Sequence, residues 1–275
     1  MFSEHKPDDD KAESSSYMDD HTFDLSNLRK PAACRLWADY KYKVGRYTAR
    51  FLSFEEDILN AFAGIMEFYQ EKIGTKFCWG LPTRSDRLFV LSLLWGPGED
   101  KGCTWLKLKR RSVKPPRYVG SQSESFPSWS WAGWMGGPVD WEWPGDEDDA
   151  PLDICSEIRW HRDESQSSTF RDRRLFACNK SGVLQFYSKV VTLSPKDLDA
   201  KCPVYMDDGM KWETDKKCCV LLASMPKHQP TVFFLVVREN AAGFCSREGV
   251  CAMALERWHE LEMTADIKFR EVQLK

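Results

Sequence analysis

The sequence predicts an α+β protein, in which an N-terminal helical subdomain is followed by a mostly antiparallel β region, either a sandwich or a partial barrel. Between residues 34 and 95, apolar residues recur at steps of three and four, which is the period of a helix with one buried face. From about residue 150 onward, short β-rich runs alternate with turn residues instead. With 275 residues, 42% of them hydrophobic, the chain is long enough to bury a sizeable core.

Two helices are expected first. One begins near Cys34, and its apolar stripe consists of Trp37, Tyr40, Val44 and Tyr47. The next has its own start signal, because Ser53 and Glu56 have the spacing of a capping box. Its apolar stripe consists of Ile58, Phe62, Ile65, Met66 and Tyr69, and Gly74 ends it.

A third helix follows a short extended piece. Residues 75–82 form that piece, and Pro82 ends it. Ser85 and Asp86 then open the helix, whose apolar residues are Leu88, Phe89, Leu91, Leu94 and Trp95. The Gly-Pro-Gly sequence at 96–98 ends it, because glycine favours a helix stop and proline cannot continue a helix.

The β region is predicted from evenly spaced short stretches that no long helix interrupts. They are residues 152–160, 183–193, 217–224, 231–238, 249–255 and 267–274. The continuous apolar run from Val232 to Val237 predicts a central strand that is covered on both faces.

Composition divides the chain into four parts. These are a disordered acidic tail (1–30), the helical subdomain (31–98), a basic linker (99–125) and a tryptophan-rich segment with the β-rich domain (126–275). The tail is acidic because residues 1–24 hold eight acids and two bases. Seven lysines and arginines fall within 101–117 without an acid among them. This basic run is either a nuclear-import or nucleic-acid patch or simply a solvated loop. The loop is favoured, because most charge runs are solvated and Trp105 is the one tryptophan within the run that could stack on a base.

The compartment expected from the sequence is the cytoplasm, with nuclear import through the basic residues 107–117 as an alternative. Neither a secretory signal nor an apolar run of membrane-spanning length is found, so no membrane partner is expected. The ten cysteines are therefore predicted to be thiols. Cys155 with His161, or Cys245 with Cys251, could share a metal, but no metal is predicted, because buried apolar thiols are the commoner arrangement.

The sharpest local feature is a tryptophan-rich segment near the middle of the chain. Its residues are Pro127, Ser128, Trp129, Ser130, Trp131, Ala132, Gly133 and Trp134. On a strand, Trp129 and Trp131 would point to one face, with small residues opposite. The indoles could form a ligand platform, for instance for a glycan, or a buried anchor between the helical and β parts, and burial is favoured because aromatic rings dominate core energetics.

The segment also carries a resemblance, together with five other pieces in the same order. These are Trp37–Tyr40, Tyr47–Leu52, Asp57–Ile65, Phe77–Pro82, Leu93–Trp95 and Pro127–Trp134. They resemble fungal heterokaryon incompatibility proteins, the HET-domain proteins, in the region that follows the signature domain. The resemblance covers roughly residues 35–135. Only about 34 residues precede the first match, so the signature domain is expected to be missing here, and no catalytic residue of the family has a counterpart.

The resemblance implies a non-enzymatic cytosolic protein of nonself recognition and programmed cell death, which acts as a regulatory or interaction platform. Its partner would be a protein or effector domain of that pathway, and no cofactor is expected. Trp79, Trp129, Trp131 and Trp134 would then tie the helical subdomain to the β region. Two alternatives are a ligand-binding module that uses exposed indoles and a cysteine hydrolase. For the hydrolase, Cys155 with His161, or Cys78 with His228 or His259, would be the candidates by residue type alone.

Overall fold

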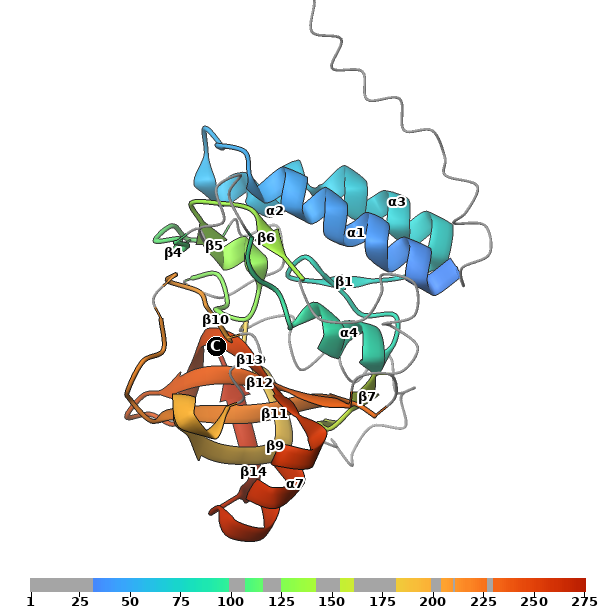
Figure 1. The fold of residues 1–275 in the computed structure, drawn as a ribbon. Coiled ribbons are helices and arrows are strands. Elements are labelled where there is room, and N and C mark those ends of the chain that lie inside the picture. The colour runs from blue at the N-terminus through green and yellow to red at the C-terminus, as the bar shows by residue number, and fades with distance from the viewer. Residues whose placement is uncertain are drawn as a thin grey trace, which may run out of the picture.

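The computed structural model describes residues 32–98, 107–115, 125–141, 154–160, 182–198, 204–209, 211–226 and 230–275. It confirms the α+β class, because a helical lobe precedes a mostly antiparallel β lobe (Figure 1). The predicted acidic tail at 1–30, and the parts of the basic linker outside 107–115, lie outside the described residues.

The helical lobe is built from four α-helices and a short 3-10 turn. They are α1 (Ala32–Thr48), η2 (Glu55–Asp57), α2 (Ile58–Ala61), α3 (Ala63–Ile73) and α4 (Asp86–Ser92). The expected stripe of α1 is buried throughout, from Trp37 to Tyr47. Gly74 ends α3 in the left-handed conformation at φ 60°, as predicted.

The predicted capping box is wrong and the predicted cap of the third helix is correct. Phe54, not Ser53, precedes the first helical turn of η2, and no side chain caps it. In contrast, the Ser85 hydroxyl accepts a hydrogen bond from the Leu88 N–H at 3.2 Å and so caps α4. The helix ends at Ser92, earlier than expected, because Gly96–Pro97 forms strand β3.

Short antiparallel pairs connect the helices to the tryptophan-rich segment. The β1–β2 hairpin (Phe77–Cys78 and Leu81–Pro82) follows α3. Strand β3 pairs with β6 (Val139–Asp140), and β4 (Lys109–Arg110) pairs with β5 (Trp134–Met135). The described part of the basic linker is therefore structured where it pairs with β5.

The β lobe is a closed barrel and not a sandwich or a partial barrel. Its ring runs β11–β12–β13–β14–β9, and β9 then pairs with β11 to close it. The bounds are β9 Leu184–Leu193, β11 Lys217–Met225, β12 Thr231–Glu239, β13 Phe244–Ala254 and β14 Lys268–Leu274. All of these pairings are antiparallel except that of β13 with β14, which is parallel.

Four further elements attach to this ring. They are β7 (Cys155–Ser156), β8 (Arg159–Trp160), β10 (Val204–Met206) and the helix α7 (Leu255–Thr264). The sequence did not predict α7, which lies between β13 and β14 and makes their parallel pairing possible. The apolar run Val232–Val237 lies in β12 between β11 and β13 and is buried along its whole length, as expected.

Alternating residues of the barrel strands belong to two cores. One set, which includes Phe186, Leu235 and Val272, is continuous with the core of the helical lobe. The other, which includes Cys219 and Phe234, is covered by Trp258 of α7. Two-sided burial explains why β11 and β12 read as continuous apolar runs. Among the described helices, none combines the length and the apolar character that a membrane crossing requires.

Candidate functional site

The tryptophan-rich segment lies between the helical lobe and the barrel (Figure 1, light green). Trp129 and Trp131 are 0% exposed and Trp134 is 7% exposed. The rings are therefore core residues and not an open platform. The segment is also not the strand considered from the sequence, because residues 131–133 form the 3-10 turn η4.

Each of the three indole N–H groups has a hydrogen-bond acceptor. Trp129 Nε1 donates to the carbonyl of Gly182, which lies just before β9, at 3.1 Å. Trp131 Nε1 donates to the hydroxyl of Tyr40 on α1 at 3.0 Å, and Trp134 Nε1 donates to the Ser128 carbonyl at 2.8 Å. Two neighbouring indoles of the segment thus reach the barrel and the helical lobe respectively, and all three N–H groups are paired.

Ser130 and Trp79 couple the segment to the β1–β2 hairpin. The Ser130 hydroxyl donates to the Trp79 carbonyl at 2.6 Å and accepts the Ala132 N–H at 3.0 Å. Trp79 has φ 52° and Gly80 has φ 84°, the pair of positive angles that a two-residue hairpin of type I′ requires. A Cβ atom on Gly80 would lie 2.7 Å from the Trp131 ring, so this turn tolerates only glycine at its second position.

Ser128 links the segment to two strands of the barrel. Its hydroxyl donates to the Lys275 carbonyl, directly after β14, and accepts the Arg247 N–H of β13 at 3.0 Å. The side chain is buried. Because β13 and β14 pair at this end of the barrel, Ser128 satisfies backbone groups that the sheet leaves unpaired.

Pro127 and Gly133 face a single arginine. The Arg110 guanidinium donates to the carbonyls of Pro127 at 3.1 Å and Gly133 at 3.2 Å, and to that of Phe126. It also lies over the Trp134 ring at 5.2 Å. A side chain on Gly133 would collide with the Pro127 carbonyl at 2.6 Å, so glycine allows the close approach.

A buried ion pair beside the segment was missed by sequence reasoning. Arg247 of β13 and Asp207, directly after β10, have side chains that are 0% and 1% exposed. Arg247 Nε lies 2.9 Å from Asp207 Oδ2, and a second nitrogen lies 3.0 Å from Oδ1. Forty residues separate the two in the chain, and no local pattern marks either one.

The same guanidinium reaches into the helical lobe. Arg247 donates to the Leu93 carbonyl at 2.8 Å and to the Trp95 carbonyl, and its Cζ lies 3.3 Å from the centre of the Trp95 ring. Burial lowers the pKa of Arg247, whereas the Asp207 carboxylate favours the charged form. A fully buried charge whose three nitrogens each donate a hydrogen bond therefore fastens the barrel to the residues that follow α4.

Among the described residues, the structure does not support the candidate cysteine sites. Cys78 is disulfide-bonded, so the expectation that every cysteine is a thiol is wrong, and a Cys78 nucleophile is ruled out in this state. A disulfide is uncommon in a reducing compartment, so the bonded Cys78 weighs against the cytoplasmic prediction. Cys245 and Cys251 belong to the two different cores, and Cys155 is exposed. Burial raises the pKa of Cys245 to about 11, which opposes thiolate chemistry there.

Of the histidines in those candidate pairs, the structure describes His259 alone. His161 and His228 lie outside the described residues, while His259 lies on the exposed side of α7. Within the described ranges, no three metal-ligating side chains come together.

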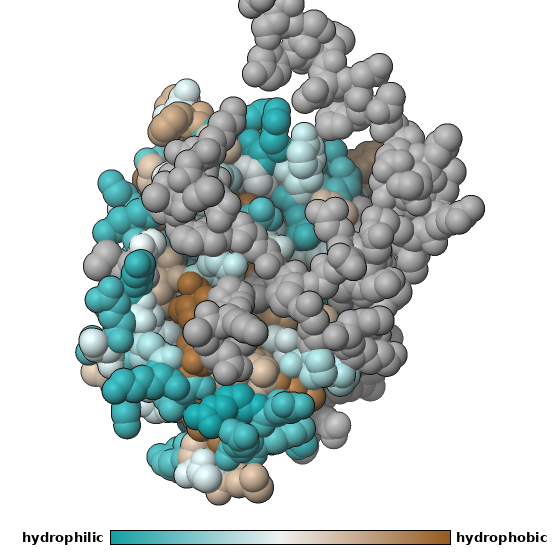
Figure 2. All heavy atoms as spheres, viewed as in Figure 1, coloured by the Kyte–Doolittle hydropathy of each residue, from teal (hydrophilic) through white to brown (hydrophobic). Residues whose placement is uncertain are grey.

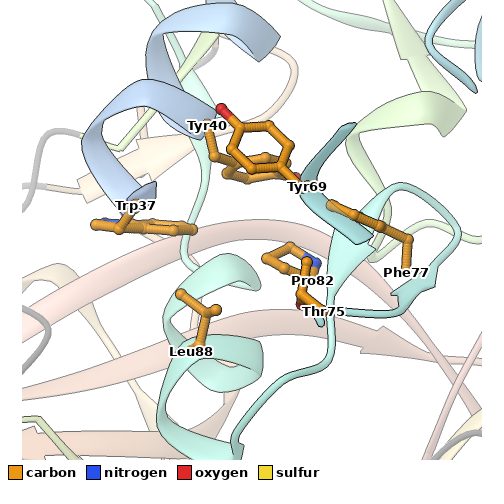
Figure 3. Close-up of a pocket in the computed structure, with 7 residues that line it drawn as sticks. All are labelled: Trp37, Tyr40, Tyr69, Thr75, Phe77, Pro82 and Leu88. Carbon is orange, nitrogen blue, oxygen red and sulfur yellow. The ribbon is translucent and has the colours of Figure 1, made fainter. Parts of the chain in front are cut away.

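An apolar pocket lies in the helical lobe between α1, α3, the hairpin and α4 (Figure 3). Its lining residues are Trp37, Tyr40, Tyr69, Thr75, Phe77, Pro82 and Leu88. The room inside is about 20 Å³, close to what one water molecule needs. The hydroxyls of Tyr40 and Tyr69 donate elsewhere, to the Gly80 carbonyl and to Asp39. The pocket is therefore too small for a cofactor and offers no polar group to orient one.

A larger, open concavity lies where α7 begins. It is lined by Lys196, Asp197, Leu198, Ala254, Glu256, Arg257 and Glu260. Charges of both signs alternate around it, and Arg257 is paired with Glu260 at 2.7 Å. This balance selects neither an anion nor a cation.

Comparison with known proteins identifies no relative: no protein-family model, no curated protein and no solved structure matches the chain. The resemblance to the heterokaryon incompatibility proteins therefore stays a prediction from the motifs.

Proposed function

We propose that this protein is a non-catalytic interaction platform of the heterokaryon incompatibility class, acting in fungal nonself recognition and programmed cell death. One observation carries the proposal: the tryptophan-rich segment is buried between the two lobes and is hydrogen-bonded to both. The segment therefore holds the lobes in one arrangement, as a binding scaffold requires.

The residues behind the resemblance also contact one another. Tyr40 donates to the Gly80 carbonyl at 2.8 Å and accepts from Trp131, while Ser130 holds Trp79. Motifs far apart in the sequence thus form one packed unit. This supports reading them as the signature of a shared fold element and not as chance matches.

The two alternatives have less support. A ligand platform needs exposed indoles, and Trp129, Trp131 and Trp134 are buried. A cysteine hydrolase needs a thiolate beside an imidazole. Cys78 is disulfide-bonded, and burial raises the pKa of Cys245 to about 11, so neither supplies a ready thiolate.

Expression in a fungal host tests the proposal. We expect the chain alone to leave the cells alive, the purified protein to leave NAD intact, and a tagged chain to capture a protein partner from the same host. Arg247→Met, which releases the barrel from the helical lobe, should weaken capture, whereas the surface control Phe269→Ser should not. Death caused by the chain alone, or NAD cleavage by the purified protein, would show an effector activity and refute a non-catalytic role.

A further inference from the structure

Two exposed phenylalanines lie on one loop at a corner of the molecule. The loop joins α1 to η2 and projects beyond the helices near β4 (Figure 1). Phe51 is 100% exposed and Phe54 is 64% exposed. Figure 2 shows apolar atoms at this corner. Single exposed apolar residues are common, but two aromatic rings on one short loop present a concentrated apolar contact.

Backbone and side-chain hydrogen bonds order this loop. The Arg50 N–H donates to the Tyr47 carbonyl at 3.1 Å, and the Asp57 N–H donates to the Phe54 carbonyl at 3.2 Å. The Tyr47 hydroxyl spans the loop and donates to the Ile58 carbonyl at 2.7 Å. Because the loop is already ordered, docking a partner on the two rings costs little additional conformational entropy.

A buried arginine lies beside the loop, and the neighbouring described residues offset its buried charge only in part. The side chain of Arg111, directly after β4, is only 6% exposed. Its Nε has no hydrogen-bond partner among the described residues. The carboxylate paired with it, that of Glu55, has its oxygen 3.9 Å from the Arg111 nitrogen, which is beyond hydrogen-bond distance. Burial lowers the pKa of Arg111, and the charge of Glu55 opposes this shift.

Arg111 and the two rings together fit a carboxylate that is flanked by apolar groups. A guanidinium presents a planar fork of donors that matches a carboxylate, and an incoming carboxylate could replace the distant Glu55. Three acids, Glu55, Glu56 and Asp57, follow the rings directly and form η2. They would repel a surface dense in phosphate, such as a nucleic acid or an anionic membrane. A peptide can avoid them, because its acids and apolar residues occupy discrete positions.

We propose that the surface formed by Phe51, Phe54 and Arg111 binds an acidic segment of a partner protein, with a carboxylate on Arg111 and apolar side chains on the two rings. This inference rests on the proposed role as an interaction platform and names the chemistry of the partner. In this proposal, the described part of the basic run contributes Arg111 as a recognition residue.

Titration of the full chain against a fluorescein-labelled peptide that places a single Asp between Phe and Leu residues in an otherwise uncharged sequence, followed by fluorescence anisotropy, tests the proposal. We expect saturable binding that weakens with added salt. Phe51→Ser or Phe54→Ser should weaken it about tenfold, the effect of losing one apolar anchor. Phe269→Ser is the matched control, because that ring is also exposed, at 51%, but lies on β14, and the variant should leave the affinity unchanged.

Two variants test the charge separately from the rings. Arg111→Lys keeps the charge but loses the fork and should weaken binding, and its near-ultraviolet circular dichroism reports whether the fold is kept. Glu55→Gln removes the competing carboxylate and should strengthen binding.

Failure of the peptide to bind, or equal losses in Phe51→Ser and Phe269→Ser, would overturn the inference. Binding of phosphatidylserine vesicles or of a single-stranded oligonucleotide that requires Phe51, without binding of the peptide, would also overturn it. Capture of a partner in the host that is insensitive to Phe51→Ser would leave the platform role intact while rejecting this surface.

Discussion

Arg247 is expected to contribute more to stability than any exposed charge on the barrel. Its guanidinium forms two hydrogen bonds to Asp207 and one each to the carbonyls of Leu93 and Trp95, all in a site without solvent access. Arg247→Met removes these donors and leaves the Asp207 carboxylate buried and unpaired. Removing one partner of a buried ion pair costs about 3–5 kcal/mol, because the remaining charge keeps its desolvation penalty.

The loss is measured by urea unfolding followed through tryptophan fluorescence, together with the melting temperature. A loss of about 3–5 kcal/mol is a large share of the roughly 5–15 kcal/mol typical of a domain, and corresponds to a melting temperature roughly 6–20 °C lower. Arg238→Met serves as the control on the neighbouring strand. Arg238 is also paired, with Glu248, but its side chain is 78% exposed, so less than about 1 kcal/mol should be lost.

A double variant separates the pair from its surroundings. Asp207→Asn combined with Arg247→Met removes both charges, and the combined loss should be smaller than the sum of the single losses by up to about 3 kcal/mol. If Arg247→Met costs no more than Arg238→Met, or if the two single losses simply add, the ion pair does not fasten the lobes in the way inferred above.

Four further outcomes follow from the structure. Gly80→Ala forces a Cβ atom to 2.7 Å from the Trp131 ring at a positive φ, so urea unfolding should show a loss of at least about 1–3 kcal/mol. Ser128→Ala leaves two buried backbone groups unpaired and should cost about 1–3 kcal/mol by the same measurement, whereas a change under a few tenths would contradict the bonds described. Iodoacetamide should modify the exposed Cys155 long before Cys245, as peptide mass spectrometry would show. Because folding raises the pKa of Cys245 from 9.0 to about 11, this thiol's contribution to stability is complete below pH 9 and is lost as the pH rises toward 11; an unchanged unfolding free energy over that interval would refute it.

Local signals predicted those parts of the fold that local chemistry controls. The stripe of α1, the glycine stop of α3 and the serine cap of α4 each depend on residues within one or two turns, so their positions could be found without a structure. The predicted Ser53 and Glu56 capping box is wrong, because residue spacing alone does not fix where the first helical turn begins. Its spacing was correct, but the chain at Phe54 is extended and the helix begins one residue later.

The candidate site was found only in part. The tryptophan-rich segment stood out in the sequence, but nothing in it distinguished an open platform from a core. That distinction depends on Gly182 and Tyr40, which lie tens of residues away in opposite directions and accept the indole hydrogens. Arg247 and Asp207 could not be predicted at all, because an ion pair between distant loops and strands has no periodicity to detect.

By itself, the sequence determined the class of the fold, the order of most helices and strands, and the central position of β12, because helical period, alternation and turn chemistry act between neighbours in the chain. The tertiary structure alone decided that the barrel closes through β9 and β11, that the indoles face inward, and that Arg111 is left with an inadequate partner. Those features arise from contacts between residues far apart in the chain, whose energies depend on burial and geometry that no local pattern encodes.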